Sequence, residues 1–404
     1  MPDHATIHNV TFGTGQEIFE NIILPAVEKA EHEVILITCF LAPSKTKDAL
    51  NESLLRLSSS ALQRARKVRV RIGFSSSGLF QKLFHTSSPA GRTYQPSEWR
   101  NLGFLGEEDL GGLDLEVKSM FFLPFSVWHP KFVVVDRKHV FLPSCNVSWE
   151  DWFEGCVEIS GGIVGRFVRF WEEEWNQDYR SGREEVMDEG DVECEFLPSP
   201  HHRNPNFALL PWQRCPPPPD TKLNLKLLDL VANAKESIYI QTPNVTCPPV
   251  LDALLDALRR GVDIRIVTSE RLMILEQLVT AGTTTDRCMR RLVRQYKQLA
   301  QSGPDEEAGL IKLGKLHVSY YVPRENPGDS GSEPVQSHLK LTVVDGSAIV
   351  FGSGNMDRAS WYTSQELGLV FYSEALITKT MQSLRSALLN RTKLVFDSET
   401  CRKT

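Results

Sequence analysis

Residues 337–371 read SHLKLTVVDGSAIVFGSGNMDRASWYTSQELGLVF, and this stretch contains the pattern that decides the fold. His338 and Lys340 are two residues apart, so their side chains lie on the same face of a β-strand. The apolar run that follows ends at Asp345 and predicts a buried strand closed by a polar turn. A second β-rich run then leads into a Gly-Ser-Gly-Asn loop that ends at Asn355.

These residue types are suited to a phosphate group. The Lys340 ammonium supplies positive charge, and the side chains of Ser353 and Asn355 supply hydrogen bonds. The His338 imidazole supplies a proton, a base or a nucleophile. A single His in a strand is usually a structural residue, so one copy of the pattern does not distinguish a site from a packed strand.

The same pattern occurs a second time, in residues 128–160, which read WHPKFVVVDRKHVFLPSCNVSWEDWFEGCVEIS. His129 is followed two residues later by Lys, seven later by Asp and 17 later by Asn, the same separations that follow His338. Glu158 comes 29 residues after its His, and Glu366 comes 28 after its own. Agreement at five positions is improbable by chance, so we infer an internal duplication with a spacing of about 209 residues.

The motif resembles the signature of the phospholipase D superfamily, in which His-x-Lys, four residues and Asp are followed by Gly-Ser-x-Asn. The second copy carries it as His338, Lys340, Asp345, Gly352, Ser353 and Asn355, and the first as His129, Lys131, Asp136, Ser144 and Asn146. The first copy departs at Pro143, which stands in place of the Gly. Proline fixes φ and has no backbone N–H. That loop therefore either binds phosphate differently or does not use the missing donor.

The resemblance implies a mechanism in which the two halves face each other and share one site. By this analogy His129 attacks phosphorus and forms a phosphohistidine, while His338 protonates the departing alcohol and then deprotonates the incoming water or alcohol. Glu158 and Glu366 are predicted to orient the imidazoles. The two Asp residues of the motifs are predicted to be structural. The predicted phosphate-binding residues are Lys131, Ser144, Asn146, Lys340, Ser353 and Asn355.

Strand–helix–strand alternation recurs in both copies. Apolar runs at 33–41 and 67–75 flank a helical segment, and runs at 237–243 and 262–269 flank another. This alternation indicates parallel strands with helices on the sheet faces. With the resemblance, it predicts an α/β fold of two tandem α/β/α halves, whose mixed, largely parallel sheets are flanked by helices and packed as a pseudo-dimer.

The chain is predicted to divide into two halves and a linker. The halves are 1–187 and 223–404, and the segment between them, 188–222, is Pro-rich and lacks periodicity. The second half contains a long insertion, 270–336, with a basic helical segment at 287–300. Insertions of this length are often lids or binding elements. We interpret the basic segment first as a solvated helix face, and second as a contact for lipid or nucleic acid.

The composition is that of an ordinary globular protein, with 41% hydrophobic and 24% charged residues. A net charge of −6 and a pI near 6.0 argue against a dedicated nucleic-acid binder. No apolar run approaches the roughly 18 residues that span a membrane, and residues 1–22 show no signal-peptide pattern. We therefore expect a cytoplasmic protein that contacts membranes at most peripherally.

The sequence predicts no metal ion and no organic cofactor. The eight cysteines show no Cys-x-x-Cys spacing. A metal site needs three or four His, Cys or carboxylate ligands, whereas each motif His is accompanied by a Lys whose ammonium repels a divalent cation. Because both motifs lie on one chain, a monomer is sufficient for a complete site.

The sequence around the second motif indicates a substrate class. Residues 237–269 resemble bacterial-type cardiolipin synthases, in which Thr-Pro follows a strand and Arg-Gly-Val-Asp closes a helix. Residues 352–360 resemble their second motif, although Ala359 stands where that group usually has Arg. We predict a phosphodiesterase or phosphatidyltransferase acting on a phospholipid, with water access deciding between hydrolysis and transfer. The alternatives are a metal-independent nuclease acting on DNA or RNA, whose bases would stack on Trp residues near the motifs, and an inactive binding module.

Overall fold

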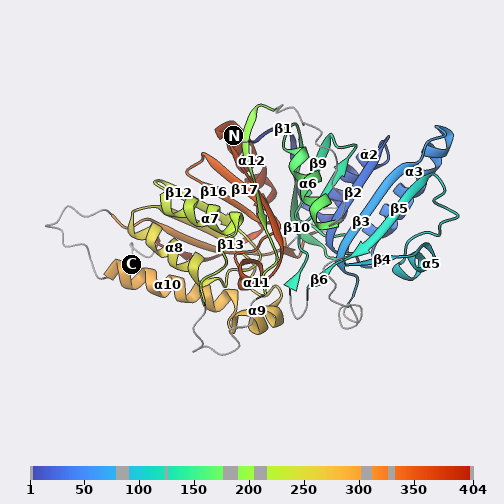
Figure 1. Ribbon diagram of the computed structural model, residues 1–404. Coiled ribbons are helices and arrows are strands. Elements are labelled where there is room, and N and C mark those ends of the chain that lie inside the picture. Colours follow the sequence, from blue (N-terminus) through green and yellow to red (C-terminus); the bar gives the residue numbers. More distant parts are fainter. Residues whose placement is uncertain are drawn as a thin grey trace. The chain divides into compact units, whose positions relative to one another are not determined.

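The structure is a computed structural model that describes residues 3–78, 91–122, 126–175, 190–203, 216–301, 312–325 and 333–400. The chain divides into two compact units, Met1–Phe196 and Leu197–Thr404. Figure 1 shows that each unit combines a β-sheet with helices, which confirms the predicted α/β class. Among the described residues, no helix is both long enough and apolar enough to cross a bilayer.

The sheet of the first unit contains parallel and antiparallel neighbours. Its strands are β1 (Asp3–Thr14), β2 (Glu33–Phe40), β3 (Val68–Ser76), β4 (Arg92–Tyr94), β5 (Leu113–Ser119), β8 (Phe132–Val135), β9 (His139–Pro143) and β10 (Trp152–Ser160), and β6 (Phe121–Phe122) and β7 (Ser126–Val127) form a separate hairpin. The helices are α1 (Gly15–Ile18), α2 (Leu24–Val27), α3 (Lys45–Gln63), α5 (Pro96–Trp99) and α6 (Val164–Trp175), with a π-helical turn at Phe19–Ile23 and a 3₁₀ turn at Arg100–Leu102. Strands β2, β3 and β5 are parallel, whereas β8, β9, β10 and β1 follow β2 as antiparallel neighbours.

The second unit repeats this order. Its strands are β12 (Ser237–Gln241), β13 (Asp263–Thr268), β14 (Leu316–Tyr321), β15 (Gln336–Ser337), β16 (Leu341–Val344), β17 (Ala348–Gly352), β18 (Glu366–Tyr372) and β19 (Thr392–Asp397). Its helices are α7 (Lys222–Asn233), α8 (Pro248–Arg259), α9 (Ile274–Ala281), α10 (Thr285–Gln301), α11 (Arg358–Tyr362) and α12 (Glu374–Ala387). Strands β12, β13 and β14 are parallel, and β16, β17 and β18 continue from β12 as antiparallel neighbours.

Two features differ from the sequence-based expectation. The parallel part of each sheet is smaller than predicted, because β8–β9 and β16–β17 are hairpins and a tight turn joins only antiparallel strands. Hairpin strands buried on both faces have the same continuous apolar pattern as parallel strands. In addition, the segment predicted as a linker, 188–222, contains a strand, β11 (Val192–Ser199).

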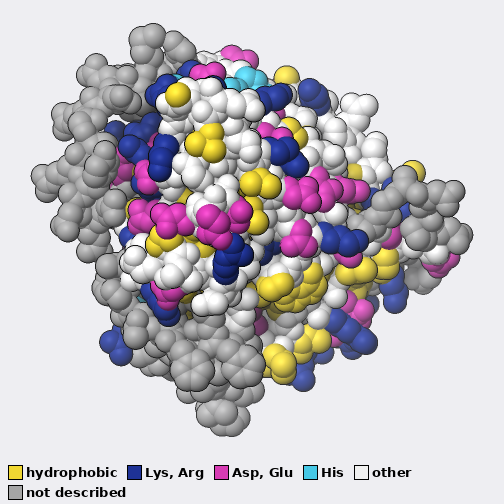
Figure 2. Space-filling model, turned by 90° about the vertical axis from the view of Figure 1, so that its right-hand side faces the viewer, with side chains coloured by type: hydrophobic (Ala, Val, Ile, Leu, Met, Phe, Trp, Pro, Cys, Tyr) yellow, Lys and Arg dark blue, Asp and Glu magenta, His cyan; other side chains and the backbone are white. Residues whose placement is uncertain are grey.

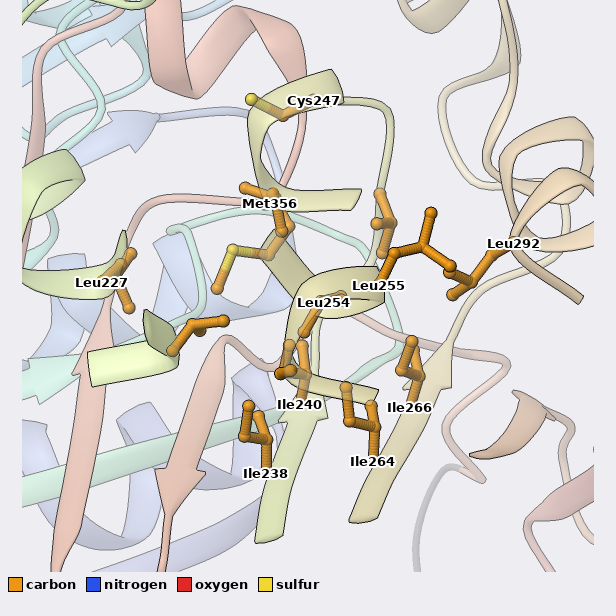
Figure 3. Packing of buried hydrophobic residues seen from close by; sticks show 14 of the residues in the cluster. Leu227, Ile238, Ile240, Cys247, Leu254, Leu255, Ile264, Ile266, Leu292 and Met356 are labelled. Carbon is orange, nitrogen blue, oxygen red and sulfur yellow. The ribbon is translucent and has the colours of Figure 1, made fainter. Parts of the chain in front are cut away.

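The core of the second unit is built on one face of its sheet. Ile238 and Ile240 of β12 are buried, as are Ile264 and Ile266 of β13. Figure 3 shows these side chains pointing toward α8, which carries Leu254. Burial of each such side chain contributes about 1.5–3 kcal/mol. On the opposite face, a cavity of about 890 Å³ separates the sheet from α12, and none of the described residues that line it belongs to either motif.

The two units also repeat individual hydrogen bonds. Thr38, near the end of β2, donates to a carbonyl two residues further on and accepts the N–H of Val147 at 3.4 Å. Thr242, just after β12, makes the same two kinds of bond and accepts the N–H of Met356 at 3.3 Å. Val147 and Met356 each follow the Asn of their motif. The loop that carries this Asn is therefore held to the end of β2 in the first unit and of β12 in the second.

A helix packs on the motif loop in both units, α1 in the first and α7 in the second. The small residue of this contact is on the helix in the first unit and on the loop in the second. In the first unit a Cβ at Gly15 of α1 would lie 3.0 Å from Cβ of Cys145. In the second unit the helix residue is Leu223 of α7, and a Cβ at Gly354 of the loop would lie 3.3 Å from its Cδ2. Each pair contains one Gly, so both contacts are close-packed with the bulk on opposite sides.

Pro143, the departure from the motif, leaves the backbone hydrogen bond of the residue after it unchanged. The N–H of Ser144 donates to the carbonyl of Gly155 at 2.8 Å, and the N–H of Ser353 donates to the carbonyl of Leu367 at 2.9 Å. The proline therefore removes none of the backbone bonds that the second copy makes after its Gly.

The close approach of β17 and β18 predicts the effect of Gly352→Ala. The new Cβ would lie 2.5 Å from the Leu367 carbonyl oxygen and 2.9 Å from Cα of Gly368, so backbone atoms must move. We expect the variant to lose about 1–3 kcal/mol of unfolding free energy, measured by urea denaturation. Gly111→Ala is the matched control, because nothing lies within 4 Å of a Cβ at Gly111. Equal midpoints for both variants would contradict the packing described for β17.

Candidate active site

His338 and Lys340 lie together immediately before β16, and both side chains are buried. The Lys340 ammonium donates to the His338 carbonyl oxygen at 2.7 Å, and its Nζ lies 2.8 Å from His338 Nε2. An ammonium only donates hydrogen bonds, so Nε2 is the acceptor in this arrangement and the ring proton is on Nδ1. The two-residue spacing therefore places a positive charge beside the ring nitrogen that is free of a proton.

Ser353 connects the end of β17 to Glu366 at the start of β18. Its hydroxyl donates to the Glu366 carboxylate and accepts the backbone N–H of Leu367 at 3.0 Å. Ser353 and Glu366 are both buried. Phosphate binding by Ser353 stays a prediction; in this structure its hydroxyl hydrogen bonds to Glu366 and fixes the position of that carboxylate.

Asn355 is held in the loop after Ser353 by a buried carboxyl group. Its Nδ2 donates to Asp357 at 2.9 Å, and its backbone N–H donates to the Ser360 hydroxyl at 3.1 Å. Burial raises the pKa of Asp357, and the bonds from Ser360 and Asn355 offset only part of that effect. The Asn355 Oδ1 is buried and accepts no hydrogen bond from a described residue. This oxygen is suited to a donor such as a hydroxyl group.

The first unit places its motif residues in the same way. Lys131 is buried and donates to the His129 carbonyl oxygen at 3.0 Å. The Ser144 hydroxyl donates to the carboxylate of Glu154 and accepts the N–H of Gly155 at 3.0 Å. Asn146 differs from its counterpart, because its Oδ1 accepts a backbone N–H, that of Phe40, at 3.2 Å.

The prediction that Glu158 is the equivalent of Glu366 in the first unit is wrong. The residue equivalent to Glu366 is Glu154. Glu154 is buried and bonded to Ser144 as Glu366 is to Ser353. Glu158 instead lies opposite Phe141 in the sheet, with its carboxylate 4.0 Å from Nδ1 of His139.

The spacing differs because the second unit has an additional turn of helix. Ser144 and Glu154 are ten residues apart, whereas Ser353 and Glu366 are 13 apart, and the interval in the second unit contains α11. Aligning the copies on the strand that follows each loop would have identified Glu154, because Glu154 lies near the start of β10 as Glu366 lies at the start of β18. Counting from the His led to Glu158.

Glu150 is a further acidic group that the sequence reading missed. Burial raises its pKa, bonds from Ser148 and its own backbone N–H oppose the rise, and the nearby Glu154 carboxylate adds to it. Lys131 lies close enough to lower it again. Its Oε2 is buried and has no hydrogen-bond partner among the described residues. Among the residues that the structure describes, no three His, Cys, Asp or Glu side chains are grouped to hold a metal ion.

Asp136 and Asp345 lie at the far ends of β8 and β16 from the His-x-Lys pairs. The Asp345 carboxylate accepts the backbone N–H groups of Lys235, Glu236 and Ser237 at 2.8–2.9 Å. Asp136 accepts the three successive N–H groups of Glu31, His32 and Glu33, at the start of β2, at 2.7–2.9 Å. Both residues have positive φ, at the first position of the hairpin turn. Each carboxylate thus joins a hairpin turn to the start of the neighbouring strand.

The Asp345 contacts predict a pH dependence of stability. Burial alone would raise the pKa of Asp345, but the backbone N–H groups of Ser237, Lys235 and Glu236 hold it below its ordinary value of 3.8. A carboxylate with a lowered pKa contributes stability above its unfolded pKa, and this contribution is lost as the pH falls through the folded pKa. Asn also adopts positive φ readily, so Asp345→Asn tests the effect of the charge without straining the backbone.

We expect Asp345→Asn to lower the unfolding free energy by about 1–3 kcal/mol at neutral pH. The difference from wild type should shrink as the pH falls below 3.8, which urea titrations at several pH values can measure. Asp252→Asn, at an exposed position of α8, is the control. A difference that stays constant down to the lowest pH would contradict the role assigned to the charge.

Comparison with known sequences identifies relatives of this chain. Residues 227–388 match the family model described as "Cardiolipin synthase, PLD-like domain". A phospholipase D from Streptomyces antibioticus is 29% identical over 180 residues, which are 41% of this chain and 30% of that protein. The match thus spans less than a third of that relative.

Two solved structures share the fold. A phosphatidylserine synthase from Haemophilus influenzae gives a TM-score of 0.61 at 14% identity, covering 97% of this chain and 89% of that one. A polyphosphate kinase from Porphyromonas gingivalis gives a TM-score of 0.53 at 10% identity, covering 96% of this chain and 49% of that one. The match to the family model thus covers residues 227–388 in the second unit, and each unit carries one His-x-Lys motif.

Proposed function

We propose that this protein acts on a phospholipid phosphodiester through a covalent phosphohistidine. The observation that supports this proposal is the set of His, Lys, Ser, Asn and Glu side chains that occurs once in each unit, with the same Lys–His and Ser–Glu hydrogen bonds. A phospholipid substrate is supported by the names of the matched proteins, which include a cardiolipin synthase domain, a phospholipase D and a phosphatidylserine synthase.

The proposed reaction has two steps at one phosphorus atom, and it requires both motifs to act there. His129 attacks phosphorus, so that an N–P bond forms while the P–O bond to the leaving alcohol breaks. For this step His338 is protonated on both ring nitrogens, and it gives the Nε2 proton to the departing oxygen. Water or an alcohol then gives a proton to His338, its oxygen bonds to phosphorus, and the N–P bond breaks. Water yields hydrolysis, and an alcohol yields phosphatidyl transfer.

The other motif residues support these steps. Lys131 and Lys340, with Asn146 and Asn355, hold the non-bridging oxygens and stabilise the charge that develops on them. Glu154 and Glu366 each accept a hydrogen bond from the Nδ1–H of an imidazole and set its tautomer. The two Ser hydroxyls position these carboxylates, and Asp136 and Asp345 are structural.

The roles of the two imidazoles are tested by His129→Ala and His338→Ala. Each change should lower turnover of vesicle phosphatidylglycerol by at least about 10²-fold, with the circular dichroism spectrum unchanged. With a phosphodiester that has a good leaving group, intact-protein mass spectrometry should detect the phosphoenzyme adduct in His338→Ala and not in His129→Ala. An adduct in His129→Ala alone would reverse the assignment, and near wild-type turnover in both variants would refute the mechanism.

The corrected position of the orienting carboxylate gives a matched pair of variants. Glu154→Gln should lower turnover at least about tenfold, because an amide does not stabilise a protonated imidazole. It should also shift the acid limb of the pH–rate profile to lower pH, since loss of the carboxylate lowers an imidazole pKa. Glu158→Gln should leave both the rate and the profile unchanged. If Glu158→Gln lowered turnover and Glu154→Gln did not, Glu158 would be the orienting carboxylate, as its spacing from His129 predicted.

A metal-independent nuclease is the second candidate. Trp149 is 61% exposed and packs edge-on against Phe40, with 5.4 Å between ring centroids, which would suit a stacked base. On the face seen in Figure 2, however, Lys and Arg side chains are interspersed with Asp and Glu, so that face does not form a continuous basic surface. Incubation in EDTA with phosphatidylglycerol vesicles, with phosphatidylcholine plus a primary alcohol, and with single-stranded DNA separates the candidates.

A further inference from the structure

Helix α9 has the reverse of the usual arrangement of polar and apolar side chains. Leu275 is 79% exposed, and Ile274, Leu278 and Val279 are 36–39% exposed. These four are among only twelve large hydrophobic side chains that are exposed in the described residues. Their spacing places them on neighbouring turns of one side of the helix. Single exposed apolar residues are ordinary, but a contiguous group marks a contact surface.

The buried side of α9 is polar. Gln277 and Thr280 are buried, and the Gln277 Oε1 accepts both the N–H and the hydroxyl of Thr285 at 2.6 and 2.9 Å. The Thr285 hydroxyl oxygen in turn accepts the N–H of Val245 at 3.0 Å. These bonds fix the orientation of the helix with its apolar side outward. Hydrophobic burial alone would favour the opposite orientation.

The same bonds attach α9 to the motif loop of the second unit. Val245 pairs with Met356, the residue after Asn355, and the N–H of Thr246 donates to the Met356 carbonyl at 3.0 Å. Figure 1 shows α9 next to α11, which follows the same loop. The exposed apolar surface is therefore carried by a helix that is connected to the loop holding Asn355.

Helix α10, which begins four residues after α9 ends, exposes a basic side. Its apolar side is buried through Met289 and Leu292. Its exposed basic residues are Arg287, Arg290, Arg291, Arg294 and Lys297. Only Arg290 among them forms an ion pair with a described residue, Asp286. In a chain whose net charge is −6, this side of α10 is a local concentration of positive charge.

We propose that α9 and the basic side of α10 together dock the protein on an anionic phospholipid bilayer. The apolar side chains of α9 enter the interface between head groups and acyl chains, and the guanidinium groups of α10 contact lipid phosphates. In a two-fold dimer through this surface the basic sides of two α10 helices would face each other and repel, whereas an anionic bilayer neutralises their charge. The role of this docking rests on the proposed function, because docking would bring substrate lipid to the second motif.

The test measures vesicle binding separately from turnover. The His338→Ala protein, which should not consume lipid, is sedimented with vesicles of phosphatidylcholine alone and of phosphatidylcholine mixed with phosphatidylglycerol. We expect binding to the mixed vesicles only, weakening as salt is raised. Leu275→Ser with Leu278→Ser should weaken binding at least about tenfold, and Arg291→Ser with Arg294→Ser about tenfold or more.

Matched controls exist on the same unit. Leu389→Ser removes a side chain that is 64% exposed, and Lys393→Ser removes an exposed positive charge outside α10. Neither should change binding. Unchanged binding in the Leu275/Leu278 variant, or equal binding to both vesicle types, would overturn the proposal. Two further results would overturn it. One is that the wild-type chain forms a dimer and binds no vesicles, and that the Leu275/Leu278 variant is a monomer. The other is that the protein binds DNA and not vesicles, and that the Arg291/Arg294 variant loses this DNA binding.

Turnover measurements then distinguish docking from the proposed chemistry. When His129 and His338 are both present, the Leu275/Leu278 variant should lose turnover of vesicle lipid and keep turnover of a monomeric short-chain phospholipid. Loss on both substrates would show that α9 acts on the site itself, which overturns the docking role. Vesicle binding without turnover of any lipid in the wild-type protein would refute the proposed function and leave the docking surface intact.

Discussion

The site of each unit depends on one buried hydroxyl group between two antiparallel strands. The Ser353 oxygen accepts a backbone N–H from β18 and donates to Glu366, so it ends the regular pairing of β17 with β18 and fixes a carboxylate at the same time. Ser144 does the same for β9, β10 and Glu154. A buried carboxylate is costly unless it is hydrogen-bonded. The hydroxyl therefore determines where the acid lies, and the loop to Asn355 begins from that fixed point.

Much of the site could be predicted from the sequence, because its residues are separated by short segments of regular backbone. Period-two alternation places His338 and Lys340 together, and a hairpin of fixed length leads to Ser353. The α/β class followed from the same local patterns. Glu154 was missed because its separation from His129 depends on whether a turn of helix is inserted, and such an insertion changes the count without changing the register of the strands.

Properties that depend on tertiary contacts were less accessible. The balance of parallel and antiparallel pairing was misjudged, because burial on both faces removes the alternation that would mark a hairpin strand. The strand inside the predicted linker was hidden by the prolines around it. The outward apolar side of α9 is visible only in the fold, since Ile274, Leu275, Leu278 and Val279 have the spacing of an ordinary core-facing helix. The burial of Gln277 and Thr280 and the hydrogen bonds of Gln277 show which side is buried.

The exchange of bulk between Gly15–Cys145 and Leu223–Gly354 has a consequence for the history of the two halves. Each contact tolerates a large residue on one side only, so the duplicated segments have become specific for their own partners. A recombination that copied the loop of one half into the other would bring two large residues together, or leave a void between two glycines. An exchange of loops between the halves would therefore weaken the packing of the first helix on the motif loop in either unit.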